Sequence, residues 1–278
     1  METIDHHAPV RVLAAVRGHP FDRTAFASLF ADMIGISVTF VDQPAAALLM
    51  RPELAAHFDA LLLYDMPGID FASEPRAMPI GPEPAVRDGM IELLEHGIGV
   101  VALHHALAGW PAWSEFADLL GGRFLYRPAI VRGERRHDSG YRHKVHYTAD
   151  SVAPSHPILH GVPHRFELID ELYLAEVFED DVVPLLRADH HFICDNFYSA
   201  TAAMEGQMFS NEGWNHPPGS NLIGWVKKAR QSPLVYLQPG DDDTTYTNPI
   251  YRRIVENALR WVTSREAHAW ASGGSDER

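Results

Sequence analysis

Cysteine is almost absent from this chain, since Cys194 is the only one among 278 residues. A single thiol excludes an internal disulfide framework and a zinc cluster built on cysteines, and it is typical of a reducing compartment. Long apolar runs are lacking too, because runs such as Ala60–Tyr64 have the length of a strand and are too short to cross a bilayer. The first ten residues have no apolar stretch behind a basic start, so no signal peptide is expected. We therefore expect a cytoplasmic protein.

Positive charge is scarce as well: 23 Lys and Arg stand against 37 Asp and Glu, a formal net charge of −14. A surface this acidic repels nucleic acid phosphates and anionic lipid headgroups, so neither nucleic acid nor membrane is expected as a partner. The fingerprints G-x-G-x-x-G, P-loop, H-E-x-x-H and G-x-S-x-G are all missing. What the chain does have is an ordinary hydrophobic content of 46% and as many as 17 histidines.

Short apolar runs alternate with segments of helical spacing in the first 120 residues, and the pattern returns near the C-terminus. The runs predict strands at Val10–Val16, Ile36–Val41, Ala60–Tyr64, Gly97–Leu103 and Leu234–Leu237. Asp22 and Asn248 are expected to cap two of the helices. Near-continuous apolar strands separated by helices predict an α/β fold, with a parallel sheet and helices on both faces.

One domain is expected over residues 10–263, with an N-terminal extension at 1–9 and a partly disordered tail at 264–278. Within it, residues 123–231 are rich in Pro, His and aromatic side chains and show short strand-like runs but no long helix. We interpret this segment as a β-rich insertion packed against the sheet. Its aromatic content also raises the hypothesis of a homodimer.

Histidines and carboxylates follow four of the predicted strands. Ligands of open α/β sheets bind beyond the carboxyl ends of the strands, where loops and helix N-termini converge. These ends supply His19, Asp65, the pair His104-His105 and the acidic run Asp241–Asp243. Each residue alone is weak evidence, but their coincidence predicts a polar site at one rim of the sheet.

The pair His104-His105 lies at a strand-to-helix turn, where hydrolases and amidotransferases of this architecture hold a nucleophile. Imidazole in that place excludes acyl-enzyme chemistry at the turn and leaves a general acid, a general base or a metal ligand. The alternative is that one histidine caps the following helix and the other packs in the core. His19 and Asp242 are further candidates for acid–base work, with a solvated turn and a helix cap as their alternatives.

Substrate-binding roles are expected for residues around this turn. Trp110 offers an apolar face to a sugar ring, with a place in the core as its alternative. Asp170, Glu171 and Tyr173 place two acids and a phenol together, although they also suit a plain turn and strand start. Asp65 and Asp241 are further candidates.

Most histidines of the insertion we interpret as surface or structural. If 142–147 is a strand, His143 and His146 face opposite sides and cannot bind one ion together.

Several motifs in this order resemble the ThuA-like family, named for trehalose utilisation. The matching segments are Val100–Trp113, Gly121-Gly122-Arg123-Phe124, His156-Pro157-Ile158, Asp170-Glu171-Leu172-Tyr173 and Pro239-Gly240-x-Asp242. The resemblance implies a flavodoxin-like sheet of the class I glutamine amidotransferase type without its Cys-His-Glu triad. It also implies a role in the breakdown of disaccharides or keto-sugars. One departure stands out: the closing motif of the family usually reads Gly-His-Asp, and here Asp241 stands at the histidine position.

We therefore expect an enzyme of carbohydrate catabolism whose substrate is a disaccharide of the trehalose type or a 3-keto glycoside. His104 or His105 would transfer the proton, His19 would be the second acid or base, and Asp242 and Glu171 would hold sugar hydroxyls or orient the imidazole. The alternative is a non-catalytic sugar-binding or regulatory module on a degenerate amidotransferase scaffold.

A divalent metal is conceivable in the same place. Bond cleavage beside a ketone needs a base and an electrophile for the enolate, and an ion held by His19, His105 and Asp241 would supply the electrophile. No recognised spacing of metal ligands marks such a site in the sequence.

Overall fold

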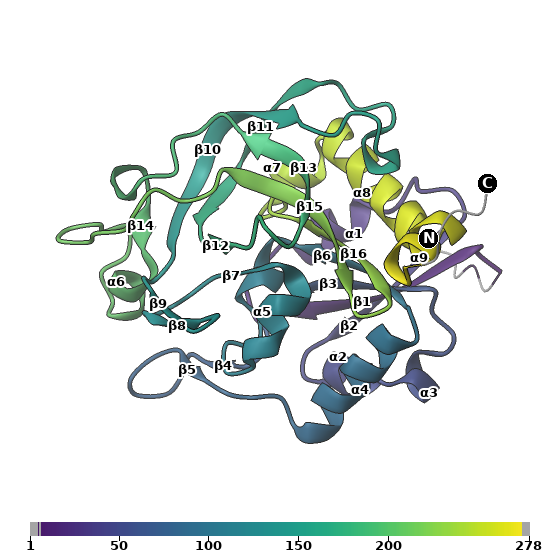
Figure 1. Cartoon of the computed structure of the whole chain (residues 1–278), viewed down its shortest axis with the longest axis horizontal. Coiled ribbons are helices and arrows are strands. Elements are labelled where there is room, and N and C mark those ends of the chain that lie inside the picture. The colour runs from purple at the N-terminus through teal and green to yellow at the C-terminus, as the bar shows by residue number, and fades with distance from the viewer. Residues whose placement is uncertain (1–4, 6, 274–278) are drawn as a thin grey trace.

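The computed structural model describes residue 5 and residues 7–273, and Figure 1 shows their arrangement. In this part of the chain the central feature is one ten-stranded mixed sheet with the order β2-β1-β3-β6-β16-β15-β13-β10-β11, in which β14 pairs with β10. Three two-stranded sheets accompany it, formed by β12 with β7, β4 with β5 and β8 with β9. The fold is therefore α/β, as predicted.

The first half of the large sheet is parallel. Its strands are β2 (Ile36–Asp42), β1 (Val10–Arg17), β3 (Ala60–Asp65), β6 (Gly99–Leu103) and β16 (Ser232–Leu237). All five predicted strands are confirmed, with bounds that differ by no more than two residues. Strands β3, β6 and β16 are buried along their whole length, because helices cover both faces of the sheet there.

The second half of the sheet is antiparallel and comes from the insertion. Its strands are β15 (Leu222–Ala229), β13 (Val183–Ala188), β10 (Gly140–Ser151), β11 (Arg165–Leu174) and β14 (Tyr198–Ser199). The insertion is β-rich, as predicted, but its strands extend the sheet itself instead of packing against it. The reason is a tight reversal at Arg230, which has a φ of +60° and lets β15 hydrogen-bond to the edge of β16.

Short strands and turns lie outside the parallel and antiparallel halves of the large sheet. They are β4 (Ile69–Asp70), β5 (Met78–Pro79), β7 (Gly122–Arg123), β8 (Ala129–Val131), β9 (Glu134–Arg136), β12 (Glu176–Val177) and the 3-10 turns at His104–Ala108, Pro157–Leu159 and Cys194–Asn196.

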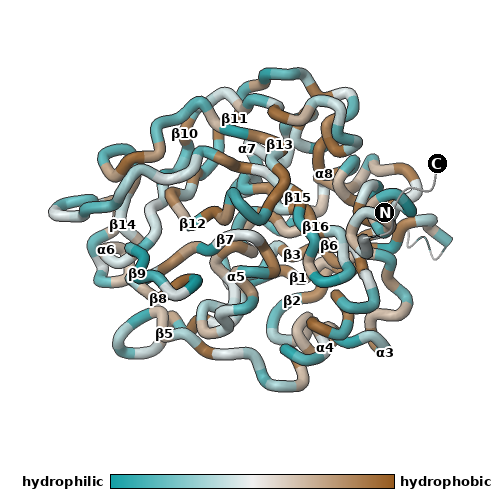
Figure 2. The backbone as a smooth tube through the Cα atoms, in the orientation of Figure 1, coloured by the Kyte–Doolittle hydropathy of each residue, from teal (hydrophilic) through white to brown (hydrophobic). Residues whose placement is uncertain are grey.

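Two groups of helices cover the two faces of the parallel half. On one face lie α2 (Ala45–Leu49), α3 (Pro52–Ala55), α4 (Pro84–Glu95) and α5 (Ser114–Leu120), whereas α6 (Ala200–Met204) lies beside β14 in the antiparallel half. On the other lie α1 (Arg23–Ser28), α7 (Asp243–Tyr246), α8 (Pro249–Val262) and α9 (Arg265–Ala271). Alternate residues of β1 enter the two cores, Leu13 on one side and Val12 on the other. Figure 2 shows hydrophobic chain through the middle of the molecule and hydrophilic chain around its periphery.

Both predicted helix caps are present. The Asp22 carboxylate accepts a hydrogen bond from the Ala25 N–H, and the Asn248 side chain accepts from the N–H groups of Ile250 and Tyr251.

The domain extends further than expected at its C-terminal end. Residues 265–271 were assigned to the tail, but they form α9, which Ser264 caps and which buries Ala267 and Ala271 against the sheet. The expected disorder at 274–278 and most of the expected extension at 1–9 lie outside the described residues. Within the described residues, no helix has the length and apolarity needed to span a membrane.

Candidate functional site

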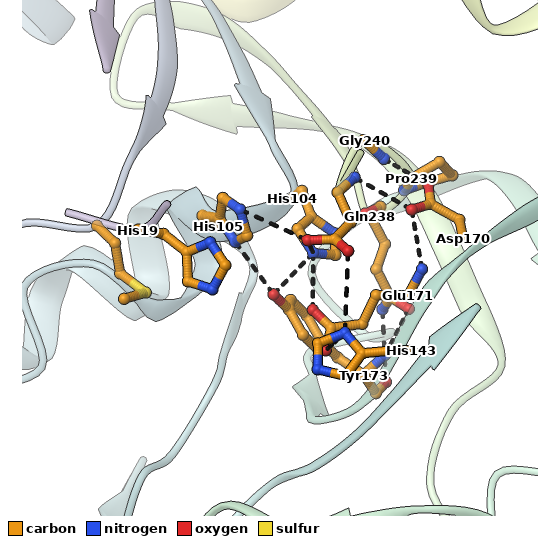
Figure 3. A network of polar contacts seen from close by, with 12 residues as sticks. His19, His104, His105, His143, Asp170, Glu171, Tyr173, Gln238, Pro239 and Gly240 are labelled. Carbon is orange, nitrogen blue, oxygen red and sulfur yellow. Dashed lines mark hydrogen bonds and ion pairs between the residues drawn. The ribbon is translucent and has the colours of Figure 1, made fainter. Parts of the chain in front are cut away.

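Three loops meet at the carboxyl ends of the parallel strands and bring predicted side chains together. His19 follows β1, His104 and His105 follow β6, and Asp241 follows β16. The rings of His19 and His105 have their centroids 4.0 Å apart, and an Asp241 carboxylate oxygen lies 3.7 Å from His104 and 3.8 Å from His105. Figure 3 shows the three histidines in succession, with Glu171, Tyr173 and His143 beside them. The structure thus brings distant segments into one cluster.

A glycine makes this approach feasible on the His19 side. Gly18 has a φ of +100°, and a Cβ atom there would lie 2.4 Å from the main-chain oxygen of Met66. Only glycine tolerates both conditions, so the chain can turn directly against the end of β3 and present His19 to the site.

His104 is fully buried, and the protein uses both of its ring nitrogens. Nδ1 donates to the main-chain oxygen of Gln238, and Nε2 lies 3.0 Å from the Glu171 carboxylate and 2.8 Å from the Tyr173 hydroxyl. Burial alone would lower the pKa of His104, but the hydrogen bond to Glu171 and the nearby Asp241 raise it to about 9. His104 is therefore a buried imidazolium that holds Glu171 in place.

His105 has the opposite character. Its side chain is 1% exposed, its Nδ1 lies 3.2 Å from the Tyr173 hydroxyl, and its Nε2 has no hydrogen-bond partner among the described residues. Burial, together with the neighbouring charge of His104, keeps the pKa of His105 well below its ordinary value. The ring is neutral at pH 7, and one nitrogen is free to bind something else.

Strand β11 serves the site from both of its faces. Glu171 and Tyr173 point toward the histidines because alternate strand residues share a face. Asp170 points the other way and accepts hydrogen bonds from the main-chain N–H groups of Gly240 (2.6 Å) and Asp241 (3.1 Å). Burial raises the pKa of Asp170 to about 7. Asp170 thus fixes the loop that carries Asp241.

His143 completes the cluster, and the sequence analysis misjudged it as surface or structural. Its Nδ1 lies 3.0 Å from one Glu171 oxygen and 3.9 Å from an Asp241 oxygen. The nearby carboxylates of Asp241 and Glu171 raise the pKa of His143 to about 10. The simple alternation assumed for this strand fails because β10 has a register shift between Arg142 and Val145, with Lys144 at a φ of +52°.

The charge of Glu171 follows from these two neighbours. Burial by itself would favour the neutral acid, but hydrogen bonds from His104 and His143 lower the pKa of Glu171 to about 2. A carboxylate thus lies between two imidazolium groups.

A cavity of about 290 Å³ opens beside the cluster. Its polar wall consists of His19, His143, Glu171 and Tyr173. The remaining wall is mostly apolar and is formed by Met66, Phe71, Ala108, Phe124, Tyr126, Tyr141, Ala200, Ala203, Met204 and Met208. The cavity therefore suits a ligand with a polar reacting end and an apolar part.

Three predicted residues lie apart from this cavity. Asp65 and Trp110 line a different, much smaller cavity of about 20 Å³ between β3 and the helices below it, where Asp65 accepts a hydrogen bond from Gln43. Asp242 caps α7 through the N–H of Thr244, which is the structural alternative considered for it. These positions follow the strands as expected, but their side chains point away from the cavity.

The sequence indicated Asp170 only as one of two acids with a candidate substrate-binding role, whereas the structure shows it bonded to the main chain of the loop after β16; Gln238 was not predicted at all. The only sequence feature that draws attention to Asp170 is its position beside Glu171 in the run Asp170–Tyr173. Gln238 accepts a hydrogen bond from the Tyr173 N–H at 2.9 Å and, through its main-chain oxygen, from His104. Nothing in the sequence distinguishes such a contact in advance.

Solved structures with the same fold come from several bacteria. A ThuA-like protein of Parabacteroides merdae is 13% identical with a TM-score of 0.62, and the match covers 92% of this chain and 90% of that one. A ThuA-like protein of Bacteroides uniformis is 16% identical with a TM-score of 0.59, covering 95% and 94%. PurLQS of Thermotoga maritima is 12% identical with a TM-score of 0.50, covering 91% and 98%. These likenesses show the fold alone, an α/β flavodoxin-like sheet with additional strands.

A family model gives the more specific result. Residues 20–262 match the model of the ThuA family, described as trehalose utilisation, and this description supports a carbohydrate-related role. No curated protein matches the chain significantly. Because the family match spans most of the chain and the resemblance noted in the sequence points the same way, this protein belongs to the ThuA family.

Proposed function

We propose that this protein is an enzyme of carbohydrate breakdown in which Glu171 and His143 transfer protons to and from a glycoside, with 3-keto glycosides as the favoured substrates. The observation that carries the proposal is the contact of 3.0 Å between these two side chains on the polar wall of a cavity whose other walls are apolar. A small-molecule carbohydrate is thus the proposed ligand.

The pair can perform an elimination beside a ketone with balanced protons. Glu171 accepts the proton from the carbon next to the carbonyl, the glycosidic C–O bond breaks, and the departing oxygen takes a proton from His143. Glu171 then holds one proton more and His143 one fewer than before. Their direct hydrogen bond returns the proton from Glu171 to His143 and resets the pair.

His104 is proposed as a positioning residue. It has no exposed surface, and its two ring nitrogens are held by Gln238 on one side and by Glu171 and Tyr173 on the other. A substrate in the cavity reaches Glu171 and His143, whereas His104 lies behind them. This differs from the expectation that His104 itself carries the proton.

The apolar walls fit the rest of such a substrate. Aromatic side chains such as Phe124 and Tyr126 can cover the C–H face of a sugar ring or an apolar aglycone. Trehalose, which is polar on all sides, would leave much of this wall in contact with hydroxyl groups. The cavity therefore favours a keto glycoside with an apolar part over trehalose.

Turnover of a panel tests the proposal. The purified protein is incubated with 3-keto glycosides, with trehalose and with unmodified glycosides, and products are identified by mass spectrometry, with and without added divalent cation. We expect cleavage of at least one keto glycoside and a loss of about 100-fold or more in kcat for Glu171→Gln.

The structure provides a matched control for that variant. Glu167 lies on the same strand as Glu171 and contacts His146 of β10 at 3.3 Å, but this pair is exposed and far from the cavity wall. Glu167→Gln should keep full kcat. Binding of the glycosides without any product, measured by calorimetry, would contradict the proposal and favour the non-catalytic sugar-binding module instead.

A further inference from the structure

We propose that His19, His105 and Asp241 form a site for one divalent transition-metal cation at the edge of the catalytic cavity. Each residue offers one ligand atom, and the three atoms lie within 4.8 Å of one another. The inference rests on the proposed function only for the role of the ion, which is to polarise the carbonyl of the substrate. The existence of the site rests on the contacts themselves.

The first argument is the unpartnered nitrogen of His105. Its side chain is 1% exposed, and its Nε2 is buried without a hydrogen bond, although the Asp241 carboxylate lies only 3.8 Å away. A buried polar atom without a partner costs free energy, so such atoms are rare unless a ligand or ion satisfies them. The Tyr173 hydroxyl can take the hydrogen on Nδ1 at 3.2 Å, which leaves the lone pair on Nε2.

His19 also has a ring nitrogen available to bind an ion. Its Nδ1 lies 2.9 Å from the main-chain oxygen of Pro20, which can only accept, so the hydrogen is on Nδ1 and the lone pair is on Nε2. Metal-binding histidines typically donate their second nitrogen to a carbonyl or a carboxylate in this manner. The ring also packs against that of His105, with centroids 4.0 Å apart.

Asp241 is held by its main chain, which leaves its carboxylate available. Its N–H donates to Asp170 at 3.1 Å, and its carbonyl oxygen accepts from the hydroxyl groups of Tyr246 at 2.8 Å and Tyr64 at 3.2 Å. The carboxylate itself has no contact shorter than 3.7 Å to a side-chain nitrogen of His104, His105 or His143, so it can still bind an ion. Two histidines and one carboxylate are a known ligand set for divalent metals and leave coordination positions open.

The placement suits a Lewis acid. His19 lines the same cavity as Glu171 and His143, so an ion next to it would face the proton-transfer pair across the substrate. The ion would bind the ketone oxygen and stabilise the enolate that forms when Glu171 removes the neighbouring proton. It would undergo no change of oxidation state.

Cobalt titration tests the site without any turnover. The full chain is stripped with EDTA, dialysed and titrated with Co²⁺ while the visible absorption is recorded, and Zn²⁺ is then added in competition. We expect one equivalent to bind, with visible bands that Zn²⁺ removes. His19→Ala and Asp241→Ala should each weaken the affinity by about 100-fold or more, because even residues that only support a ligand change it 10- to 100-fold.

Two further variants make the result specific. Asp241→His replaces one ligand type with another and should restore binding to within about tenfold of the unchanged protein. His146→Ala removes an exposed histidine that also contacts a carboxylate and should change nothing. Circular dichroism melting curves establish that each variant is folded.

The proposal is overturned if Co²⁺ does not bind stoichiometrically, or if His19→Ala and Asp241→Ala bind as tightly as the unchanged protein. If the proposed function is wrong but the metal site is right, Co²⁺ will bind and no glycoside will be cleaved. Turnover by the stripped enzyme in EDTA would contradict the proposed role of the ion in polarising the carbonyl, and the acid–base function would still hold.

Discussion

Individual histidines in this cluster differ because their neighbours differ. His104 lies between Gln238 and Glu171 and carries a charge, whereas His105, the next residue, faces no carboxylate within hydrogen-bonding distance and stays neutral. The sequence His-His therefore encodes two roles at one turn. His104 has a φ of +37°, which is rare for a residue with a side chain, and the two rings lie edge to face with their centroids 4.5 Å apart.

Removing the His104 ring should be costly for stability. His104→Ala leaves the buried Glu171 carboxylate without one of its two imidazolium partners, and we expect the free energy of unfolding to fall by about 3 to 5 kcal/mol. Urea denaturation measures the loss. A change of less than 1 kcal/mol would show that the pair contributes little, and His146→Ala serves as the exposed control.

Asp65 should impose a pH-dependent cost on the fold. Burial raises the pKa of Asp65 to about 6, even though Gln43 donates to the carboxylate. The unfolded chain loses this proton near pH 4 and the folded chain near pH 6, so stability falls between these values and stays lower above them. Asp65→Asn removes the ionisation, and we expect a gain of roughly 2 to 3 kcal/mol at pH 7.5.

The pH profile of that gain is the check on its cause. Urea denaturation of both proteins at pH 4 and pH 7.5 should show little difference at the lower pH and the full difference at the higher one. A gain that is equal at both values would mean that ionisation of Asp65 is not responsible.

At the scale of elements, the turns after the parallel strands decide where side chains go. The turn after β1 needs Gly18, because an added Cβ would overlap the main chain of Met66. Gly18→Ala should lower the free energy of unfolding by about 2 kcal/mol or more, since it adds overlap to an unfavourable φ.

A second glycine separates these two effects. Gly133 has a φ of +80° but no neighbour within 4 Å of an added Cβ, so Gly133→Ala should cost only about 1 kcal/mol. Equal losses for the two variants, measured in urea, would contradict the close packing of the β1 turn against β3.

Some secondary-structure elements and contacts could be predicted from the sequence, and others could not. Four of the parallel strands were predictable as largely buried apolar runs, and the half-buried β2 was predictable from its alternating Ile36, Val38 and Phe40. Asp22 and Asn248 were predictable caps because their bonds are local. The pairing of β15 with β16 was not, since hydrogen bonds between strands carry no signal in either strand alone. His143 was missed because a bulge in β10 changes which way its side chain points.

The same distinction applies to the site. His19, His105 and Asp241 were predictable as a group because they follow parallel strands, whose carboxyl ends converge. Asp65 follows such a strand too, yet it turns toward Gln43 and a different cavity. The end of a strand fixes where a residue is, and the local packing decides where its side chain points.

At the scale of the whole molecule, the insertion contributes side chains to the candidate site. Its strands β10 and β11 carry His143, Glu171 and Tyr173, whereas the parallel half carries His19, His105 and Asp241. The cavity lies where these two halves of one sheet meet, and neither half contains all of the polar wall. The parallel half alone would therefore lack the proposed acid–base pair, Glu171 and His143.

Self-association through the insertion remains a prediction. Met208 and Phe209 are more than half exposed in this segment, and an acidic protein with an exposed apolar patch gains by covering it with a second copy. Light scattering at micromolar concentration should give about twice the chain mass of 31.1 kDa. A mass close to that of one chain would reject the homodimer.

The central claim is that a glycoside binds where the two halves of the sheet meet, with its scissile bond between Glu171 and His143. A crystal structure of the Glu171→Gln variant soaked with a sulfur-linked 3-keto glycoside, which resists cleavage, tests it most directly. We predict the sugar in the cavity of about 290 Å³, with the linking sulfur next to His143 and the carbonyl turned toward His19. A ligand bound elsewhere on the molecule, with this cavity filled only by water, would contradict the account.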